Sequence, residues 1–222
     1  MSGNRQIEFD YAALLEKCGG KPLHDRPSSH LLLDGDVLVK FCRPLRFPQD
    51  YLRRYLGSSY ASRETSGYAR LKRLGLRTPE TFAHRVFYDP SNPFESALAM
   101  EYLAGKVTAH IHLSALPPPQ KAPFVQLIAN DIRRMVDANI FFKDLQLTNV
   151  MAGPDGLPYW IDPEMHVMTN RRRCQLATAN RLQRLVRKAK EILDPQSIAA
   201  LETTVFGGDP EFHGILSRTP QS

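Results

Sequence analysis

Three polar side chains that could bind a metal ion lie in the second half of the 222-residue chain, at Asp144, Asn149 and Asp162. Asp144 and Asn149 are separated by a spacing that a single tight loop can span. The residues that follow predict a short hairpin, with strands over 150–152 and 158–161 joined by a Gly-Pro-Asp-Gly turn. Because the second strand of a hairpin returns to the start of the first, we expect Asp162 to lie beside Asn149.

Such an arrangement gathers two carboxylates and one amide oxygen, which are the hard oxygen ligands that Mg²⁺ prefers. Phosphoryl transfer needs a metal site of this kind, together with a carboxylate that receives the proton of the attacking hydroxyl group. We therefore assign Asn149 and Asp162 to metal binding and Asp144 to the role of catalytic base. Asp and Asn are also common turn residues, so a polar turn is the alternative. The strands, the turn and the second aspartate together favour the metal site.

A lysine that could contact phosphates lies in the first half of the chain. The residues from His30 to Cys42 predict a hairpin that turns at Asp34 and Gly35, and Lys40 is the only charged residue in its second strand, 37–41. Such a lysine is either an edge-strand charge that extends to solvent or a cation directed into a cleft, where it would bind nucleotide phosphates. The metal-type cluster favours the second interpretation.

A carboxylate partner for this lysine is expected on the helix that follows. Apolar residues recur at spacings of three and four over 60–74, which predicts an amphipathic helix, and Glu64 lies on its apolar stripe. Because a buried carboxylate is costly unless it is paired, we expect Glu64 to form an ion pair with Lys40. The alternative is a first-turn glutamate that is stabilised by the helix dipole.

Further elements can be expected from local composition. Residues 97–103 predict an apolar strand that ends in a hinge, where backbone groups from Glu101 to Leu103 could hydrogen-bond to an adenine edge. A run of three prolines reads as a stiff connector before a helix over 122–138. The segment after Phe206 is rich in Gly, Pro and polar residues, and we expect it to be loose.

The segment 142–164 resembles the catalytic and metal-binding loops of the protein-kinase-like fold. The runs VLVKFCR, RETSGYARLKRLGLRTPETF, AMEYLAG and NIFFKDLQLTNVMAGPDGLPYWID further resemble the bacterial lipopolysaccharide core kinases, including the small kinase-like proteins described as toluene-tolerance proteins. This resemblance extends from about Lys21 to Leu193. It implies one α+β kinase-like domain, with a small β-rich amino lobe over 1–102 and a mainly helical carboxy lobe over 103–222.

The resemblance also implies an activity, which is ATP-dependent phosphorylation of a sugar in the lipopolysaccharide core or a related glycolipid. ATP and Mg²⁺ would be the cofactors, and the reaction would take place on the cytoplasmic face of the inner membrane. Two alternatives stay open: a protein kinase, and a degenerate kinase-like module that binds nucleotide or a partner without turnover. The chain has no Ala-Pro-Glu element after Asp162, which argues against the protein kinase.

The chain departs from the usual kinase pattern in three places. No glycine occurs over 24–29, where a Gly-rich phosphate loop should fall, although Ser28 and Ser29 could offer hydroxyl groups. Phe142 stands where His or another polar residue is common, and Pro163 replaces the Gly that often follows the metal-binding aspartate. The first departure bears on how efficiently ATP binds, whereas the other two remove neither the base nor a metal ligand.

Composition narrows the class of protein. The chain is 42% hydrophobic and 23% charged, which is typical of a globular protein. No apolar run approaches the roughly 20 residues of a membrane-spanning helix. The three cysteines lack the spacing of a zinc site or a disulfide framework, which fits a reducing cytoplasm.

Basic residues are concentrated near the carboxyl end. Residues 165–190 include no acidic residue, in a chain with a net charge of +6. A helix over this stretch would place five basic residues opposite an apolar face: Arg181, Arg184, Arg187, Lys188 and Lys190. This face is either an ordinary solvated surface or a contact for anionic lipid, phosphorylated glycolipid or nucleic acid. No RNA- or DNA-binding motif accompanies it, so we expect peripheral contact with an anionic membrane surface rather than with nucleic acid.

Overall fold

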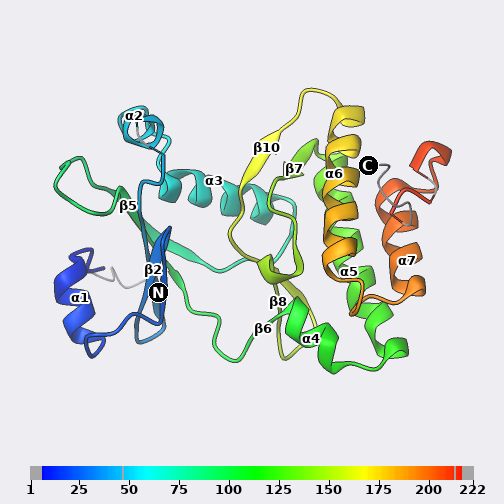
Figure 1. The fold of residues 1–222 in the computed structure, drawn as a ribbon, viewed down its shortest axis with the longest axis horizontal. Coiled ribbons are helices and arrows are strands. Elements are labelled where there is room, and N and C mark those ends of the chain that lie inside the picture. The colour runs from blue at the N-terminus through cyan, green and yellow to red at the C-terminus, as the bar shows by residue number, and fades with distance from the viewer. Residues whose placement is uncertain (1–6, 47, 213, 217–222) are drawn as a thin grey trace. The chain divides into compact units, whose positions relative to one another are not determined.

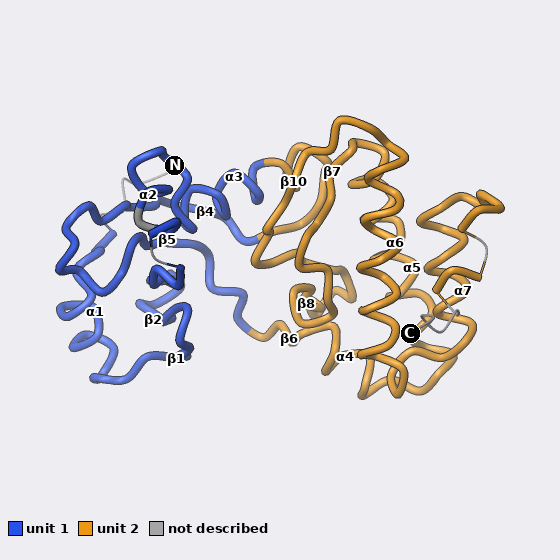
Figure 2. Tube along the Cα trace, turned by 45° about the horizontal axis from the view of Figure 1, so that its top comes forward, with its two compact units in different colours: residues 1–69, 79–104 blue, residues 70–78, 105–222 orange. Residues whose placement is uncertain are grey.

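The structure is a computed structural model that describes residues 7–46, 48–212 and 214–216 (Figure 1). The chain divides into two compact units, which Figure 2 draws in blue and orange. The first unit contains residues 1–69 and 79–104, and the second contains residues 70–78 and 105–222.

The first unit is built on a five-stranded antiparallel sheet with the strand order β1-β2-β3-β5-β4. Its strands are β1 (His24–Arg26), β2 (Ser29–Asp34), β3 (Val37–Cys42), β4 (Thr81–Val86) and β5 (Ser96–Glu101). Three helices accompany them: α1 (Tyr11–Lys17), α2 (Gln49–Tyr55) and α3 (Tyr60–Arg73), of which α3 continues past the boundary into the second unit.

Alternation along β3 gives its two faces different partners, because successive side chains of a strand point to opposite sides of the sheet. Val37, Val39 and Phe41 are buried in one apolar cluster with Leu14 of α1. Leu38 packs on a second cluster that contains Tyr68 of α3. Lys40 shares the parity of Leu38 and therefore lies on the α3 face of the sheet.

The expected elements of this unit are present, with small shifts at their ends. The β2–β3 hairpin closes with the pair Asp34 and Val37, so its turn residues are Gly35 and Asp36 rather than Asp34 and Gly35. Gly35 has a φ of 63°, which glycine adopts without strain. The strand expected over 97–103 runs from Ser96 to Glu101, because the chain leaves the sheet after that residue.

The second unit contains four helices and five short strands among its described residues. The helices are α4 (Ala109–Ala115), α5 (Pro118–Asp137), α6 (Arg171–Lys188) and α7 (Pro195–Phe206). The strands are β6 (Val107–Thr108), β7 (Ile140–Phe142), β8 (Val150–Ala152), β9 (Pro158–Trp160) and β10 (Met165–Val167), and two short 3₁₀ helices cover Leu147–Asn149 and Pro210–Phe212. One apolar core joins α5, α6 and α7 to the hairpin through the fully buried Trp160.

Two expectations about this unit were wrong. Helix α5 begins at Pro118 instead of residue 122, because proline is well suited to the first helical turn, where its missing N–H would have no partner. The segment after Phe206 is not loose throughout, since Phe212 and Leu216 are buried and Glu202 accepts a hydrogen bond from the Leu216 N–H at 2.9 Å. Residues 217–222 lie outside the described part.

No helix in the described part of the chain combines the length and the apolar character needed to cross a membrane.

Candidate active site

The hairpin predicted after Asn149 is present and brings its two ends together. Val150 of β8 pairs with Trp160 of β9, and the Ile161 N–H donates a hydrogen bond to the Asn149 carbonyl at 3.0 Å. Asp162 is the next residue along the chain. The backbone therefore returns to Asn149 one residue before Asp162.

Asp144 and Asn149 are in direct contact. The side-chain amide of Asn149 donates to the Asp144 carbonyl at 2.9 Å and to its carboxylate Oδ2 at 3.0 Å. These bonds direct the amide nitrogen toward Asp144 and leave the Oδ1 atom, which would bind a metal ion, on the other side of the amide. Asn149 is buried, whereas Asp144 is exposed.

Gln146 is a site residue that the sequence reasoning missed. Its Nε2 donates to the Asp144 Oδ2 at 2.8 Å, so that two amides hold one carboxylate oxygen. The available signal was a polar side chain two positions after the proposed base. The two bonds fix the orientation of the carboxylate that would receive a proton.

Asp162 lies in a strained backbone conformation at the end of the hairpin. Its φ of 50° is in the left-handed region, which is uncommon for a residue other than glycine. Such conformations cost of order 1–3 kcal/mol and cluster at functional sites. The Asp162 carbonyl accepts a hydrogen bond from the Glu164 N–H at 2.9 Å, which helps to hold this turn.

A two-stranded sheet ties the loop of Asp144 to the loop of Asp162. Strands β7 and β10 pair Phe142 with Met165, and the Lys143 N–H donates to the Glu164 carbonyl at 2.8 Å. The Lys143 Nζ also contacts the Glu164 carboxylate at 2.5 Å. Phe142 is buried and packs on Trp160, with ring centroids 5.4 Å apart, so that this unusual residue has a place in the core.

Helix α5 packs against the β8–β9 hairpin and forms a hydrogen bond with it. The Trp160 Nε1 donates to the Asp131 Oδ2 at 2.9 Å. Burial raises the pKa of the Asp131 carboxyl, and the hydrogen bond from Trp160 and the charge of Arg134 oppose that rise. The contact positions β9, the strand that leads to Asp162.

Residues 70–78 belong with this unit because they bind the same hairpin. The Arg77 carbonyl accepts a hydrogen bond from the Trp160 N–H at 2.9 Å. The Arg77 guanidinium contacts the Asp155 carboxylate at 2.5 Å and the Tyr159 hydroxyl at 3.2 Å. The Leu-Gly-Leu-Arg-Thr-Pro stretch therefore holds the strand of Trp160 and the turn that precedes it.

The first unit contains the expected ion pair. The Lys40 Nζ lies 2.8 Å from the Glu64 Oε2, and the two side chains are only 15% and 9% exposed. The Tyr68 hydroxyl donates to the other carboxylate oxygen of Glu64 at 3.2 Å. The lysine is therefore held by α3 and does not extend freely into solvent.

The expected hinge keeps one backbone donor without a partner among the described residues. The Glu101 N–H donates to the Glu80 carbonyl at 2.8 Å, and the Tyr102 N–H donates to the Asp36 carbonyl at 2.9 Å. The N–H of the buried Leu103 has no described hydrogen-bond partner. A donor of this kind suits an adenine edge, while the Glu101 carboxylate instead accepts a hydrogen bond from the Glu80 N–H at 3.1 Å.

The turn between β1 and β2 has no glycine. Arg26 pairs with Ser29, which leaves Pro27 and Ser28 as the turn residues. The Ser28 carbonyl accepts a hydrogen bond from the Arg43 N–H at 2.9 Å. The turn is thus a tight hairpin, in place of the glycine-rich loop that usually approaches phosphates closely.

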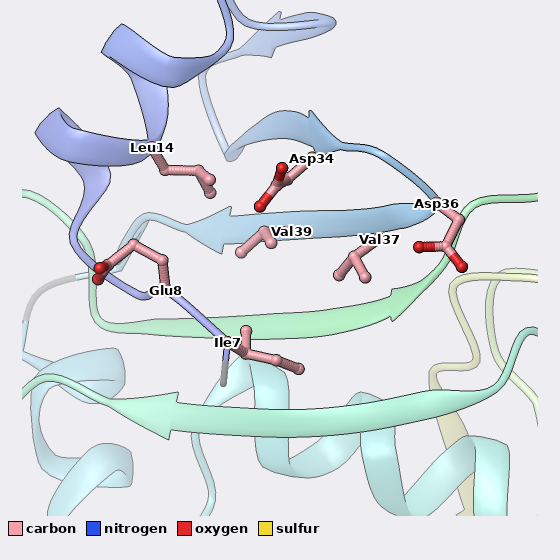
Figure 3. A pocket seen from close by; sticks show the side chains of 7 residues that line it. All are labelled: Ile7, Glu8, Leu14, Asp34, Asp36, Val37 and Val39. Atoms are coloured by element: carbon pink, nitrogen blue, oxygen red, sulfur yellow. The ribbon is translucent and has the colours of Figure 1, made fainter. Parts of the chain in front are cut away.

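The first unit also contains a pocket of about 190 Å³ (Figure 3). Val37 and Val39 of β3 line it together with Leu14 of α1 and the acidic side chains of Asp34 and Glu8. Because these valines have the opposite parity to Lys40, this pocket is not the expected nucleotide site.

The proposed metal ligands are few. The described residues include no cluster of three or more His, Cys, Asp and Glu side chains that could hold a metal ion. Asn149 and Asp162 would supply one amide oxygen and one carboxylate. This donor set fits Mg²⁺, which is usually held by one or two carboxylates and completed by water and substrate phosphates.

No protein-family model and no curated protein sequence matches the chain. Among solved structures, the chain is similar to WaaP in a complex with acyl carrier protein, with a TM-score of 0.65 and 18% sequence identity. The match covers 94% of this chain and 90% of the WaaP chain. The chain has a kinase-like fold. The likeness establishes the fold alone.

Proposed function

We propose that this protein is a Mg²⁺- and ATP-dependent kinase that phosphorylates a hydroxyl group of a lipopolysaccharide core sugar or a related glycolipid. The observation that carries this proposal is the pair of amides that holds the Asp144 carboxylate, next to a hairpin that bonds Ile161, the residue before Asp162, to Asn149. The ion pair of Lys40 and Glu64 supplies the second part that kinase chemistry requires.

Each residue then has a role that follows from its contacts. Asp144 orients the acceptor hydroxyl and accepts its proton, while Gln146 and Asn149 keep its carboxylate in place. Asn149 and Asp162 hold Mg²⁺, which when bound offsets the negative charge of the phosphates. Lys40 binds the nucleotide phosphates and is oriented by Glu64. The backbone from Glu101 to Leu103 binds the adenine edge.

The acceptor is proposed on two supports. The sequence resembles the lipopolysaccharide core kinases over most of its length, and the fold is similar to that of WaaP over 94% of the chain. A reaction that uses ATP would take place in the cytoplasm. The basic face of α6 would give the protein peripheral contact with the anionic inner surface of the membrane that holds the glycolipid.

A kinase-like module that binds nucleotide without turnover is the second candidate. The glycine-free turn between β1 and β2 favours it, because the backbone there cannot approach the phosphates as glycine allows. The ordered Asp144 carboxylate opposes it, since a module without turnover has no need of a positioned base.

A transfer assay separates these candidates. Purified protein is incubated with ATP labelled at the γ-phosphate, Mg²⁺ and extracted lipopolysaccharide, with casein as a protein substrate in parallel. We expect label in the lipopolysaccharide, and we expect Asp144→Ala to reduce it by roughly 10²–10⁴-fold, the usual contribution of general acid–base catalysis. Asp89→Ala, at an exposed loop aspartate, is the matched control and should leave transfer unchanged. Label in casein alone would indicate a protein kinase, and ATP binding without label would indicate the non-catalytic module.

A further inference from the structure

A basic pocket lies beside the proposed catalytic base, entirely within the second unit. It has a volume of about 310 Å³ and is lined by residues 144–146 and by one face of α6. The helix contributes four cationic side chains to the pocket, from Arg181, Arg184, Arg187 and Lys188. Asp144 supplies the only carboxylate among the lining residues.

The cations of this pocket have no acidic partners among the described residues, in contrast to Arg171 and Arg172 at the start of the same helix. Arg171 pairs with Asp137 at 2.6 Å, and Arg172 contacts Asp209 at 3.4 Å. No ion pair joins any of the four pocket cations to a described carboxylate. The protein therefore pairs Arg171 and Arg172 internally and leaves a concentrated positive charge around the pocket.

The helix dipole does not account for this arrangement. Basic residues are favoured at the carboxyl end of a helix, but the effect falls off within the last turn. Arg181 and Arg184 precede the last turn of α6, which ends at Lys188. Their spacing of three residues continues to Arg187 and places these side chains on one side of the helix. Repulsion between like charges in one concave site is relieved most directly by an anionic ligand.

The lining residues indicate which ligand this is. The pocket includes Asp144 but neither of the proposed metal ligands, Asn149 and Asp162. Lys40, the proposed phosphate contact, belongs to the other unit. The pocket thus lies beside the base and is lined by neither proposed metal ligand, which suits the acceptor rather than the metal ion. Its volume is at the lower end of small-molecule sites, enough for a sugar with one substituent.

We propose that this pocket binds a phosphate group already present on the sugar acceptor and so brings a neighbouring hydroxyl group to Asp144. Guanidinium groups suit this task because their planar fork of donors matches phosphate oxygens in a bidentate manner. The inference deepens the proposed kinase function and rests on it, since it names an already phosphorylated sugar as the class of acceptor.

Binding can be measured without ATP, which separates this inference from the kinase reaction. Glucose 6-phosphate, glucose and inorganic phosphate are titrated calorimetrically into the full-length protein. We expect glucose 6-phosphate and inorganic phosphate to bind and glucose not to bind. Arg184→Ala should weaken glucose 6-phosphate binding by about tenfold or more, because a hydrogen bond to a charged group exceeds the free energy of one tenfold step. Arg173→Ala removes the same charge from an exposed position of α6 outside the pocket and should have little effect.

Asp144→Ala distinguishes the two proposals. It should reduce transfer by roughly 10²–10⁴-fold yet retain or strengthen glucose 6-phosphate binding, because it removes a negative charge from the pocket wall. If Arg173→Ala and Arg184→Ala weakened glucose 6-phosphate binding equally, the proposed pocket would be overturned. Binding of the protein to phosphatidylglycerol vesicles without binding to glucose 6-phosphate would also overturn it. Transfer to lipopolysaccharide by a protein that binds no sugar phosphate would refute the pocket and leave the kinase standing. Sugar-phosphate binding without any transfer would refute the kinase reaction and leave the pocket standing.

Discussion

Glu64 lies on the buried side of α3, where it accepts hydrogen bonds from both Lys40 and Tyr68. Removing one member of a buried ion pair leaves an uncompensated charge, which costs more than the pair contributes as a whole. The effects of Lys40 and Glu64 should therefore be coupled. This applies both to the stability of the first unit and to the orientation of the lysine.

The first prediction is a double-mutant cycle on this pair. Lys40→Met and Glu64→Gln should each remain folded and each impair phosphate transfer, and the double variant should be little worse than either single one. We expect an interaction energy of about 0.5–3 kcal/mol, calculated from kcat/KM for ATP. Lys17→Met and Asp34→Asn, which break an ion pair in which the lysine is 62% exposed, provide the matched control and should leave kcat/KM unchanged. Additive losses in the first cycle would show that Glu64 does not orient Lys40.

Much of the local geometry of the candidate site could be predicted at the level of single residues because its signals are local. Asp144, Asn149 and Asp162 lie within one short stretch, and turn chemistry links them. Gln146 and the phosphate pocket could not be predicted in this way. The contact of Gln146 depends on the loop conformation, and the pocket exists only because α6 packs beside residues 144–146.

For the helices and strands too, local patterns could be predicted from the sequence, whereas contacts that depend on packing could not. Periodicity predicted α3, and turn chemistry predicted the β8–β9 hairpin. The start of α5 at Pro118 was missed because the proline run was read as a connector. Trp160 and Asp131 are 29 residues apart in sequence, and only packing brings them together. Patterns within one element do not show which distant carboxylate a tryptophan will meet.

The second prediction uses this contact between α5 and β9. Burial raises the pKa of Asp131 in the folded protein, so the folded state holds its proton at a pH where the unfolded chain has released it. Stability is therefore lost as the pH rises from the unfolded carboxyl pKa through the raised folded value. Asp131→Asn has no ionisable group and keeps an oxygen that can accept the Trp160 hydrogen bond. The variant should gain stability relative to the wild type across that pH window.

Urea denaturation over a series of pH values from acid to neutral measures this difference. Trp160→Phe is the companion variant, since it removes the donor and leaves the carboxylate buried. It should lower the free energy of unfolding by about 1–3 kcal/mol at neutral pH. If the curves of Asp131→Asn and the wild type ran parallel at every pH, the buried carboxylate would not contribute to stability as we describe.

On the scale of the whole molecule, the residues proposed for one reaction are divided between two units. Lys40 and Glu64 belong to the first unit, and Asp144, Asn149 and Asp162 belong to the second. The chain passes between the units at residues 69–70, 78–79 and 104–105, so neither unit is a continuous stretch of sequence. The proposed kinase function assigns residues of both units to one reaction, so a variant in each unit tests it separately.

Calorimetric titration with ATP, in the presence and absence of Mg²⁺, tests this central claim most directly. The wild type should bind ATP more tightly with Mg²⁺, and Asp162→Ala should remove that dependence. Lys40→Met, in the first unit, should weaken ATP binding both with and without Mg²⁺. Asp144→Ala should bind ATP nearly as the wild type does. Binding that is independent of Mg²⁺, or that Asp162→Ala and Lys40→Met leave unchanged, would contradict the assignment of these residues to one Mg²⁺-dependent nucleotide site.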